Sequence, residues 1–410
     1  MKILLINNFF SNVAGAENLA YEEYNLLHNI GHEVFFFATS RQPYFISNYI
    51  YSKYFPEYID FRSATLFTKF RNILKIFHNN EAAQKLDLMV NKIKPDIAHL
   101  HNIDYHLSPS VLKCLYKNNI PVVITLHDTR LICPGGTLQY KSTSFCNDLL
   151  CLKGNPLHCI VNRCKENSLT KSTLVSLENI YRKYYNLYDY VSLFICPSQA
   201  LADLLVRSGV KSSKIKVINN FVPDSLVLQD FNNDNNNYFL YTGRLTSYKG
   251  IYTLISVFKE LPDISLHIVG KGEEEHNIRN IIDSEALSNI HIQGFKTGKA
   301  LEEEYINSIA TIIPSEWFEN FPLSVLESFS HGKAVIGSNL GGIPEIIDND
   351  INGIIINYGD IVQLKSSILK LYQNRTLAKE LGKNARNKYE RCYTPDLYLS
   401  RLIEAFLHMY

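Results

Sequence analysis

The sequence predicts an α/β protein built from two doubly wound parallel sheets that face each other across a cleft. At 410 residues the chain exceeds the size at which one hydrophobic core usually stops growing, so two domains are expected. Short apolar runs alternate with longer amphipathic ones, which is typical of parallel strands joined by helices. The alternation stops at an Asn-rich stretch, FNNDNNN at 231–237, and then starts again.

The first half of the chain carries this pattern from its start. We expect strands at Ile3–Ile6, Val34–Ala38, Ile97–Leu100 and Val122–Leu126, and a helix at Glu17–Ile30. Leu19, Leu26, Leu27 and Ile30 can share one side of that helix. Gly31 suits its end, because glycine adopts the left-handed conformation without strain.

The second half repeats the pattern. Strands are expected at Tyr238–Tyr241, Ser265–Val269, Ile290–Gln293, Ala310–Ile313, Ala334–Gly337 and Gly353–Ile356, with helices at Tyr252–Leu261, at Pro322–His331 and beyond Asp360. We therefore divide the chain into an N-terminal domain (1–222) with a Cys-rich insertion at about 130–170, a linker (223–237), a C-terminal domain (238–385) and a C-terminal helix (386–410) that returns towards the N-terminal domain.

Composition and charge narrow the class of protein. The 46% hydrophobic and 20% charged residues are ordinary for a globular protein, and a formal net charge of +1 gives no field that would recruit nucleic acid. No apolar run is long enough to cross a bilayer, and polar residues from Asn7 onward interrupt the apolar start, which we interpret as a strand rather than a signal peptide. We expect a cytoplasmic protein that binds no nucleic acid.

Two basic residues follow the first strand of the second half. In YTGRLTSYKG, Gly243 and Arg244 come after the strand, and Lys249 ends a short loop before the next helix. A planar guanidinium and a mobile ammonium at one strand end suit a diphosphate whose negative charge grows as it leaves. Plain surface charge is the alternative, and the flanking glycines favour phosphate binding.

Two carboxylates lie in the segment PSEWFENFPLSVLESFSHG. Glu319 belongs to a loop, and Glu327 to the helix that a proline opens. The backbone N–H groups of Asn320, Phe321 and Leu323 can face a ligand at that helix N-terminus. Carboxylates accept hydrogen bonds from vicinal hydroxyls, so one can hold a sugar and the other a ribose.

The motifs and their order resemble family 4 retaining glycosyltransferases of the GT-B fold, which consists of two Rossmann-like domains. The hallmark of that family is a Glu, seven residues and a second Glu, matched by Glu319 and Glu327, and its Gly-Arg-Leu and Lys-Gly are matched at 243–245 and 249–250. Further similarities are CPSQA at 196–200, LHIVGKGEEE at 266–275 and GGIPEIIDNDINGIII at 341–356. The resemblance spans nearly the whole chain.

This resemblance implies transfer of a hexose-type sugar, with retention, from a nucleotide-diphosphate sugar to a hydroxyl of a glycan or lipid-linked acceptor. The pathway implied is synthesis of a surface polysaccharide such as O-antigen, capsule or exopolysaccharide. Glu319 would contact the transferred sugar and stabilise its positive charge, Glu327 would bind the ribose, and Arg244 with Lys249 would bind the diphosphate. No cofactor is expected to be required for catalysis.

On the N-terminal side, two strand ends carry candidate residues. Gly15, in SNVAGAENLA, can let a phosphate approach a helix N-terminus, although the family has two adjacent glycines where this chain has Ala-Gly. His127 follows the strand VVITL, where the resemblance implies contact with a sugar hydroxyl and a catalytic role; a structural histidine is the alternative. His99, His101 and His106 either line the acceptor side, or flank a helix or lie exposed to solvent.

Five cysteines cluster in the insertion: Cys133, Cys146, Cys151, Cys159 and Cys164. They could hold a structural zinc ion. Their spacings lack the Cys-x2-Cys pairs of standard zinc modules, so unpaired thiols or disulfides are the alternative.

An amphipathic stretch, ATLFTKFRNILKIFHNN at 64–80, places Phe67, Phe70, Leu74 and Phe77 on one helical side among basic residues. Packing of this stripe on the sheet is favoured. Peripheral contact with the inner face of an anionic membrane is the alternative, and it would suit a lipid-linked acceptor.

Three other functions stay open. Glycosidase carboxylates would have to flank one glycosidic bond, which would leave the basic pair unexplained. A non-catalytic sugar-nucleotide-binding subunit of a transferase complex would not need the full set of charged residues. A sugar-nucleotide epimerase or phosphorylase on the same fold would release no glycosylated acceptor.

Overall fold

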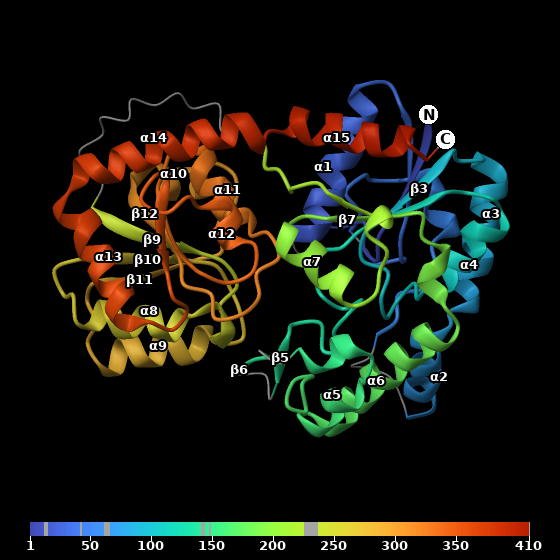
Figure 1. The fold of residues 1–410 in the computed structure, drawn as a ribbon, viewed down its shortest axis with the longest axis horizontal. Helices are drawn as coiled ribbons and strands as arrows, with labels where there is room; N and C mark the ends of the chain where they lie inside the picture. The colour runs from blue at the N-terminus through green and yellow to red at the C-terminus, as the bar shows by residue number, and fades with distance from the viewer. Residues whose placement is uncertain are drawn as a thin grey trace. The chain divides into compact units, whose positions relative to one another are not determined.

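The computed structural model describes residues 1–11, 15–41, 43–60, 66–140, 144–146, 149–224 and 237–409. These residues form two compact units, each with its own sheet (Figure 1). Unit 1 comprises Met1–Gly136, Asp148–Asn219 and Tyr398–Tyr410, and unit 2 comprises Thr137–Asn147 and Asn220–Leu397. Most of the linker predicted at 223–237 lies outside the described residues.

Unit 1 is built on a parallel sheet with the strand order β2-β1-β3-β4-β7-β8. Its strands are β1 (Lys2–Ile6), β2 (Glu33–Phe37), β3 (Ile97–Leu100), β4 (Val122–Thr125), β7 (Leu193–Cys196) and β8 (Ile215–Val217). Its α-helices are α1 (Gly15–Asn29), α2 (Leu66–Phe77), α3 (Asn80–Ile93), α4 (Ser110–Lys117), α5 (Leu157–Val161), α6 (Leu169–Tyr184), α7 (Gln199–Arg207) and most of α15 (Pro395–Leu407). Its 3₁₀ turns are η1 (Ile50–Tyr54), η2 (Leu150–Lys153), η3 (Leu187–Tyr190) and η4 (Ser212–Lys214).

Unit 2 is built on a second parallel sheet, with the order β11-β10-β9-β12-β13-β14. Its strands are β9 (Tyr238–Thr242), β10 (Ser265–Val269), β11 (Ile290–Gly294), β12 (Ser308–Ile313), β13 (Val335–Ser338) and β14 (Gly353–Ile356), with β5 (Gln139–Tyr140) and β6 (Ser144–Phe145) as a separate antiparallel pair. Its helices are η5 (Ser247–Lys249), α8 (Ile251–Lys259), α9 (Glu275–Ser284), α10 (Lys299–Asn307), α11 (Leu323–Ser330), α12 (Ile343–Ile346), α13 (Ile361–Gln373) and α14 (Arg375–Cys392).

Helices cover both faces of the unit 2 sheet, because its strands bury side chains on both sides. Ile312 and Ile336 belong to one core cluster, which includes α8 and α13. Their chain neighbours Ile313 and Val335 belong to a second cluster, which includes α11 and α14. Successive residues of one strand therefore serve two cores, as a doubly wound sheet requires.

The predicted strands form, and so do most predicted helices, with boundary differences of one or two residues at most ends. The single C-terminal helix predicted at 386–410 is wrong, because this stretch is divided between the end of α14, at Cys392, and α15 (Pro395–Leu407). β7 and β8 were not among the expected strands, although both extend the unit 1 sheet. Ile30 was expected on the buried side of the first helix, and this was wrong: α1 ends at Asn29, and Ile30 lies exposed in the turn before Gly31, whose φ is +89°.

The interpretation of residues 64–80 also changes. α2 forms, but Leu74 is exposed and Phe77 packs edge-on against Tyr181 of α6, with ring centroids 5.6 Å apart. The side chains of Phe67 and Phe70 lie outside the described residues. The expected packing of this stripe on the sheet is therefore wrong for Leu74.

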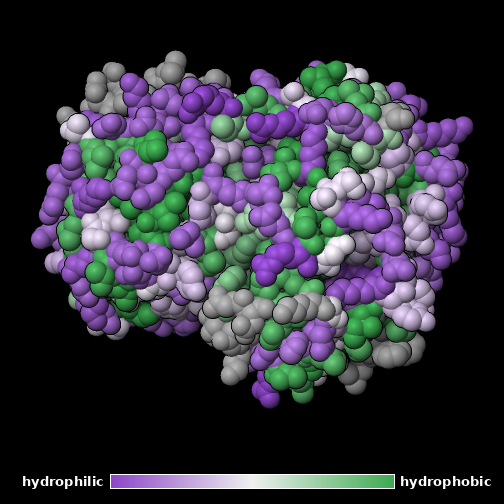
Figure 2. Space-filling view, viewed as in Figure 1, coloured by the Kyte–Doolittle hydropathy of each residue, from purple (hydrophilic) through white to green (hydrophobic). Residues whose placement is uncertain are grey.

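The surface of the molecule is mixed, with hydrophobic residues among hydrophilic ones. Figure 2 shows hydrophobic residues at the surface over α5 and α6, at the lower edge of the view. None of the described helices combines the length and the hydropathy needed to span a bilayer.

Candidate active site

The loops that meet at one point of each sheet define where a ligand can bind. In unit 2 the chain builds outward in both directions from the neighbouring strands β9 and β12, and in unit 1 from β1 and β3. Doubly wound sheets bind ligands at the carboxyl ends of such a strand pair, where the loops diverge. Arg244 and Lys249 follow β9, and Glu319 follows β12, so the predicted residues lie at the switch point of unit 2.

Lys249 and Glu319 form an ion pair between these two loops. The Lys249 ammonium donates to Glu319 Oε1 at 2.6 Å, and Ser315 Oγ donates to the same oxygen at 2.5 Å. The ammonium also lies 4.8 Å from the ring centroid of Trp317, a favourable cation–π distance. Glu319 is 5% exposed. Within the described part of the chain, every hydrogen bond to its carboxylate ends on Oε1, so Oε2 can accept from a hydroxyl group.

Two glycines let backbone segments approach closely around Glu319. Gly250 has a φ of +72°, and a Cβ there would lie 1.9 Å from the carbonyl oxygen of Pro314. Gly341 has a φ of +64°, and a Cβ there would lie 2.1 Å from the carbonyl oxygen of Glu319. The same carbonyl accepts from the backbone N–H of Gly342 at 2.7 Å. Larger residues would push these loops apart, so the glycines fix the position of Glu319.

Glu327 is held by a second hydrogen-bonded chain. Thr242, the last residue of β9, lies 2.8 Å from the Tyr305 hydroxyl, which donates to Glu327 Oε2 at 2.7 Å. Burial raises the pKa of Glu327, and the Tyr305 hydrogen bond acts in the opposite direction. His331 stacks on the Tyr305 ring at 5.0 Å. Counting the described residues alone, Glu327 also keeps one carboxylate oxygen, Oε1, for a hydroxyl group.

Arg244 lies near these residues in sequence but contacts a different carboxylate. Its side chain is 67% exposed and is paired with Glu273 at 3.4 Å. An exposed pair of this kind is worth about 0–1 kcal/mol, so a ligand phosphate could readily displace Glu273. The structure therefore brings Lys249 to Glu319 but does not bring Arg244 and Lys249 onto one partner.

The backbone groups predicted to face a ligand lie at the start of α11. Asn320 and Phe321 lie in the turn that precedes the helix, and Leu323 is its first residue. Phe321 is anchored, because its ring packs on Tyr393 at 5.7 Å and its carbonyl accepts from the Asn220 side chain at 3.4 Å. The start of a helix can bind an anion through backbone N–H groups, so the role of these three residues stays a prediction.

In unit 1, Gly15 and His127 occupy the predicted kinds of position. Gly15 is exposed and is the first residue of α1, while residues 12–14 before it lie outside the described residues. His127 follows β4 and is half-buried. Its Nε2 lies 2.9 Å from Nδ1 of His101, and the two rings stack at 5.1 Å. Burial lowers the pKa of His127, and the neighbouring His101 lowers it further. The roles of both residues stay predictions.

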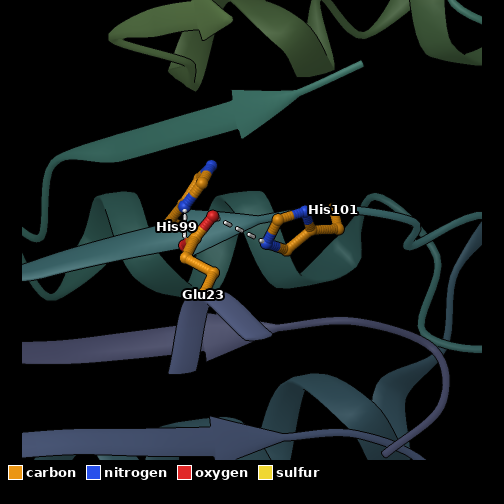
Figure 3. A group of neighbouring side chains, drawn as sticks. All are labelled: Glu23, His99 and His101. Carbon is orange, nitrogen blue, oxygen red and sulfur yellow. Dashed lines mark hydrogen bonds and ion pairs between the residues drawn. The ribbon is translucent and has the colours of Figure 1, made fainter. Parts of the chain in front are cut away.

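A buried carboxylate organises the histidines behind His127. Figure 3 shows Glu23 of α1 between His99 and His101 of β3 and the loop after it. His99 Nδ1 lies 2.6 Å from Glu23 Oε1, and Nε2 of His101 lies 3.8 Å from Oε2. The Tyr398 hydroxyl of α15 donates to Oε2 at 2.5 Å. The network thus runs from Tyr398 through Glu23 and His101 to His127.

Ionisation of Glu23 follows from these neighbours. Burial alone would raise its pKa, but the charges and hydrogen bonds of His99 and His101 outweigh burial and hold the pKa well below its ordinary value. Burial lowers the pKa of His101. The centre of the network is therefore an ionised carboxylate.

The same three side chains are the group that could hold a metal ion, as far as the described residues extend. Their ligand atoms lie within 4.8 Å of one another. Ligands bound to zinc at about 2.0–2.1 Å in tetrahedral geometry would stand roughly 3.3 Å apart. The 2.6 Å between His99 and Glu23 is shorter and fits a charge-assisted hydrogen bond. The contacts favour a hydrogen-bonded network over a metal centre.

The other histidine of the predicted cluster lies elsewhere. His106 packs against Phe9 and Tyr58, with ring centroids 5.1 and 5.0 Å away. Exposure in solvent was one of the interpretations left open for His99 and His101, and their burial rules it out.

The five clustered cysteines do not form one ligand set. Cys146 lies in unit 2, whereas Cys133, Cys151, Cys159 and Cys164 lie in unit 1. None of the five is in a disulfide, and no group of them qualifies as a metal site over the residues the structure describes. A hydrogen bond from Cys164 lowers the pKa of Cys159 to about 7, and the same contact raises the pKa of Cys164. The structural zinc considered from the sequence is therefore not supported.

Comparison with known proteins assigns the family. The family model described as Glycosyltransferase Family 4 matches residues 13–226, and the model described as Glycosyl transferases group 1 matches residues 228–388. The chain belongs to glycosyltransferase family 4.

Curated relatives match parts of the chain. An uncharacterised glycosyltransferase of Methanocaldococcus jannaschii is 27% identical over 203 residues, which are 48% of this chain and 56% of the relative. O-antigen chain mannosyltransferase C of Escherichia coli is 26% identical over 179 residues, covering 42% of this chain and 46% of the relative. The matches thus span about half the length of these relatives.

Solved structures share the fold of the whole chain. Sucrose-phosphate synthase of Thermosynechococcus elongatus has a TM-score of 0.72 at 15% identity, covering 100% of this chain and 98% of the other. HepE of Anabaena, solved with UDP-glucose, has a TM-score of 0.68 at 16% identity, with both chains covered completely. The predicted fold, GT-B with two Rossmann-like units, is confirmed.

Sequence reasoning missed Glu23 and Tyr305. The signal for Glu23 was present: Leu19, Glu23 and Leu27 share the spacing of one helical face, so a carboxylate sits within a buried stripe. A buried carboxylate needs partners, and His99 in β3 and His101 just after it are available.

Proposed function

We propose that the chain is a retaining hexosyltransferase that moves a sugar from a nucleotide-diphosphate donor to a hydroxyl of a glycan or lipid-linked acceptor. The observation that carries this proposal is the pair of carboxylates, Glu319 and Glu327, each with one oxygen fixed by the protein and one left over. Two such oxygens at one switch point suit two separate hydroxyl-bearing groups, the transferred sugar and the ribose. Lys249 and Arg244 supply positive charge for the diphosphate between them.

In this mechanism Glu319 orients the sugar and stabilises the positive charge that develops on it. Lys249 moves from Glu319 towards the diphosphate as negative charge grows there, and Arg244 exchanges Glu273 for phosphate oxygens. Backbone N–H groups at and just before the start of α11, those of Asn320, Phe321 and Leu323, are proposed to turn towards the diphosphate. The acceptor hydroxyl attacks from the face that the diphosphate leaves, and a departing phosphate oxygen takes its proton. In unit 1, Gly15 admits a donor phosphate at the start of α1 and His127 contacts a sugar hydroxyl, and catalysis requires no cofactor.

The proposal also covers the biological process, for which the names of two relatives are the support. One relative, the O-antigen chain mannosyltransferase, is named for transfer to a polysaccharide. Another, a sulfoquinovosyl transferase of Arabidopsis thaliana that is 28% identical over 155 residues, is named for transfer of a sugar derivative. We propose surface polysaccharide synthesis, in the cytoplasm at the inner face of the membrane. The proposed domain division is the one given above, with residues 1–222 on the acceptor side and 238–385 on the donor side.

A two-stage experiment tests the proposal. Nucleoside diphosphates and their sugars are first screened by thermal shift, starting with UDP-glucose because HepE was solved with it. Release of the nucleoside diphosphate is then measured with and without lipid-linked and free glycan acceptors. Release that depends on an acceptor supports a transferase. Binding without any release would point to a non-catalytic subunit, and a changed donor sugar without an acceptor would point to an epimerase.

A further inference from the structure

Helix α6 buries mainly polar side chains and exposes large apolar ones. Its inward residues are mostly polar or charged: Ser172, Ser176, Glu178, Asn179 and Arg182 are buried alongside Val175. Its outward residues include Leu169, Leu177, Ile180 and Tyr184, each at least 40% exposed. These four positions fall within one side of a 3.6-residue helix, so they form a continuous apolar stripe.

The inward side explains why the helix keeps this orientation. Arg182 is 3% exposed and bonds to Glu178 at 2.8 Å, to Asp104 at 3.3 Å and to the Tyr188 hydroxyl at 3.1 Å. Ser176 donates to the carbonyl of Pro156 at 3.0 Å, which ties α6 to the start of α5. Rotating the stripe inward would break this buried ionic network, at a cost typical of separating buried charges. The buried contacts of Arg182 and Ser176 therefore keep the apolar stripe of α6 exposed.

Neighbouring helices extend the apolar surface. α5 and α2 both contact α6. Leu157 and Val161 of α5 are exposed, Val161 by 78%, and so is Leu74 of α2. At the end of α6, Tyr181, Tyr184 and Tyr185 form an aromatic group, with successive ring centroids 4.7 and 5.0 Å apart. Apolar patches of this kind on a monomer mark a surface that something else covers.

The charge around the stripe indicates what covers it. Arg71, Arg163 and Lys183 are exposed and belong to none of the ion pairs formed by the described residues. In the segment 149–185 the carboxylates are Glu178, which is buried against Arg182, and Glu166, which pairs with Lys171. Leucine, isoleucine and tyrosine flanked by unpaired cations are what an anionic bilayer surface binds.

We propose that the α2–α5–α6 face, defined by Leu74, Leu157, Val161, Leu177, Ile180 and Tyr184, docks on an anionic lipid bilayer. The apolar side chains enter the boundary between headgroups and acyl chains, and the tyrosines lie at headgroup level. A second copy of the chain fits less well, because a two-fold contact through this face would oppose the same cations on both copies. Docking would bring the enzyme to a lipid-linked acceptor, and that purpose, unlike the docking itself, rests on the proposed function.

Vesicle flotation of the full chain tests the proposal, with no donor present. We expect at least tenfold more protein on vesicles of phosphatidylcholine with about a third phosphatidylglycerol than on phosphatidylcholine alone, and less binding at high salt. The triple variant Leu177→Gln, Ile180→Gln, Tyr184→Gln should lose at least tenfold of this binding. The double variant Arg163→Gln, Lys183→Gln should lose the preference for anionic lipid. A matched control, Ile361→Gln with Val362→Gln, changes exposed apolar residues of α13 and should bind like the native chain.

Several results would overturn the proposal. These are native protein that stays with the soluble fraction, a triple variant that floats as the native chain does, or a lipid-free dimer that the triple variant abolishes and vesicles do not compete with. Thermal unfolding of each variant checks the fold, and the charge variant keeps the test valid if the triple variant unfolds. Thermal shift by donors on the same variants separates the two proposals, because donor binding can fail while docking succeeds, or the reverse.

Discussion

The ammonium of Lys249 lies 2.6 Å from Glu319 Oε1, joining the loop after β9 to the loop after β12. The cation that we propose binds a diphosphate and the carboxylate that we propose binds a sugar are thus paired with each other. A donor that separates them must supply a phosphate to one and a hydroxyl to the other. The pair therefore favours ligands that offer both groups at once.

Breaking this pair from either side should have different effects. Lys249→Met should weaken nucleoside diphosphate binding by about 1.5–3 kcal/mol, the worth of a charge-assisted hydrogen bond. Glu319→Gln should preserve the Ser315 contact and the fold, and lower turnover by on the order of a hundredfold. Calorimetry and steady-state kinetics measure the two effects. Lys365→Met, which breaks an exposed pair with Glu260, is the control and should change neither. Native turnover in Glu319→Gln would remove Glu319 from the mechanism.

Donor binding should depend on pH through Glu327. Because burial raises the pKa of Glu327, its carboxylate takes up a proton at a higher pH than an ordinary glutamate, and the proton removes an acceptor for the ribose hydroxyls. Affinity should therefore fall as the pH is lowered, measured by titration between about pH 8 and pH 5.

Tyr305→Phe tests the same point. The Tyr305 hydrogen bond lowers the pKa of Glu327, so its removal should move the loss of affinity to higher pH and cost about 1 kcal/mol of binding at neutral pH. Tyr372→Phe, which removes a hydroxyl that bonds to Asp263 in the same unit, is the matched control. An unchanged pH profile in Tyr305→Phe would contradict the role given to Glu327.

Glu23→Gln should destabilise unit 1 by about 3 kcal/mol, because it removes the charge that buried His99 and His101 face. The folded pKa of Glu23 lies below its ordinary value of 4.5, so the stabilisation by its ionised form is complete above that pH and is lost as the pH falls below it. The difference between the native chain and the variant should therefore shrink in acid. Urea unfolding at about pH 7 and about pH 4 measures it. Glu22→Gln, one residue away and partly exposed, should have little effect at either pH.

Gly250 and Gly359 have the same φ, so alanine substitutions there can measure the cost of backbone strain apart from the cost of a steric clash. Gly250 and Gly359 both have a φ of +72°, but a Cβ at Gly250 would collide with Pro314, whereas a Cβ at Gly359 would meet nothing within 4 Å. Gly359→Ala should cost roughly 1–2 kcal/mol of stability and leave the donor affinity unchanged. Gly250→Ala should cost more and also weaken donor binding, because the Lys249 loop must shift. Equal effects in thermal unfolding and in donor titration would show that the contact with Pro314 is unimportant.

The parts that were predicted from sequence are those that rest on local pattern. Strands buried on both faces are apolar runs, so β3, β4 and β12 could be located directly. Glu319 and Glu327 stand in one short segment whose order resembles a known family. β8 escaped notice because its three residues include a lysine and are only partly buried.

The parts that were missed depend on partners distant in the sequence. Tyr305 and Glu327 are 22 residues apart and belong to different helices, and nothing in the spacing of either helix pairs them. Glu23 gains its partners 76 and 375 residues away. α6 shows its apolar side outward because the buried Arg182 pairs with Asp104, from the loop after β3. Such contacts are set by topology, which a periodic pattern along one helix does not contain.

The hydrogen bond from Tyr398 to Glu23 affects the order in which the two units can fold during translation. Translation supplies residues 1–136 first, yet at roughly 5–20 residues per second the ribosome reaches position 398 only tens of seconds after Glu23. During that interval the carboxylate lacks one of its donors, whereas residues 220–397 of unit 2 come out of the exit tunnel as one stretch. Unit 1, which begins to be synthesised first, therefore gains the contact of Tyr398 with Glu23 only after residues 220–397 of unit 2 have been made.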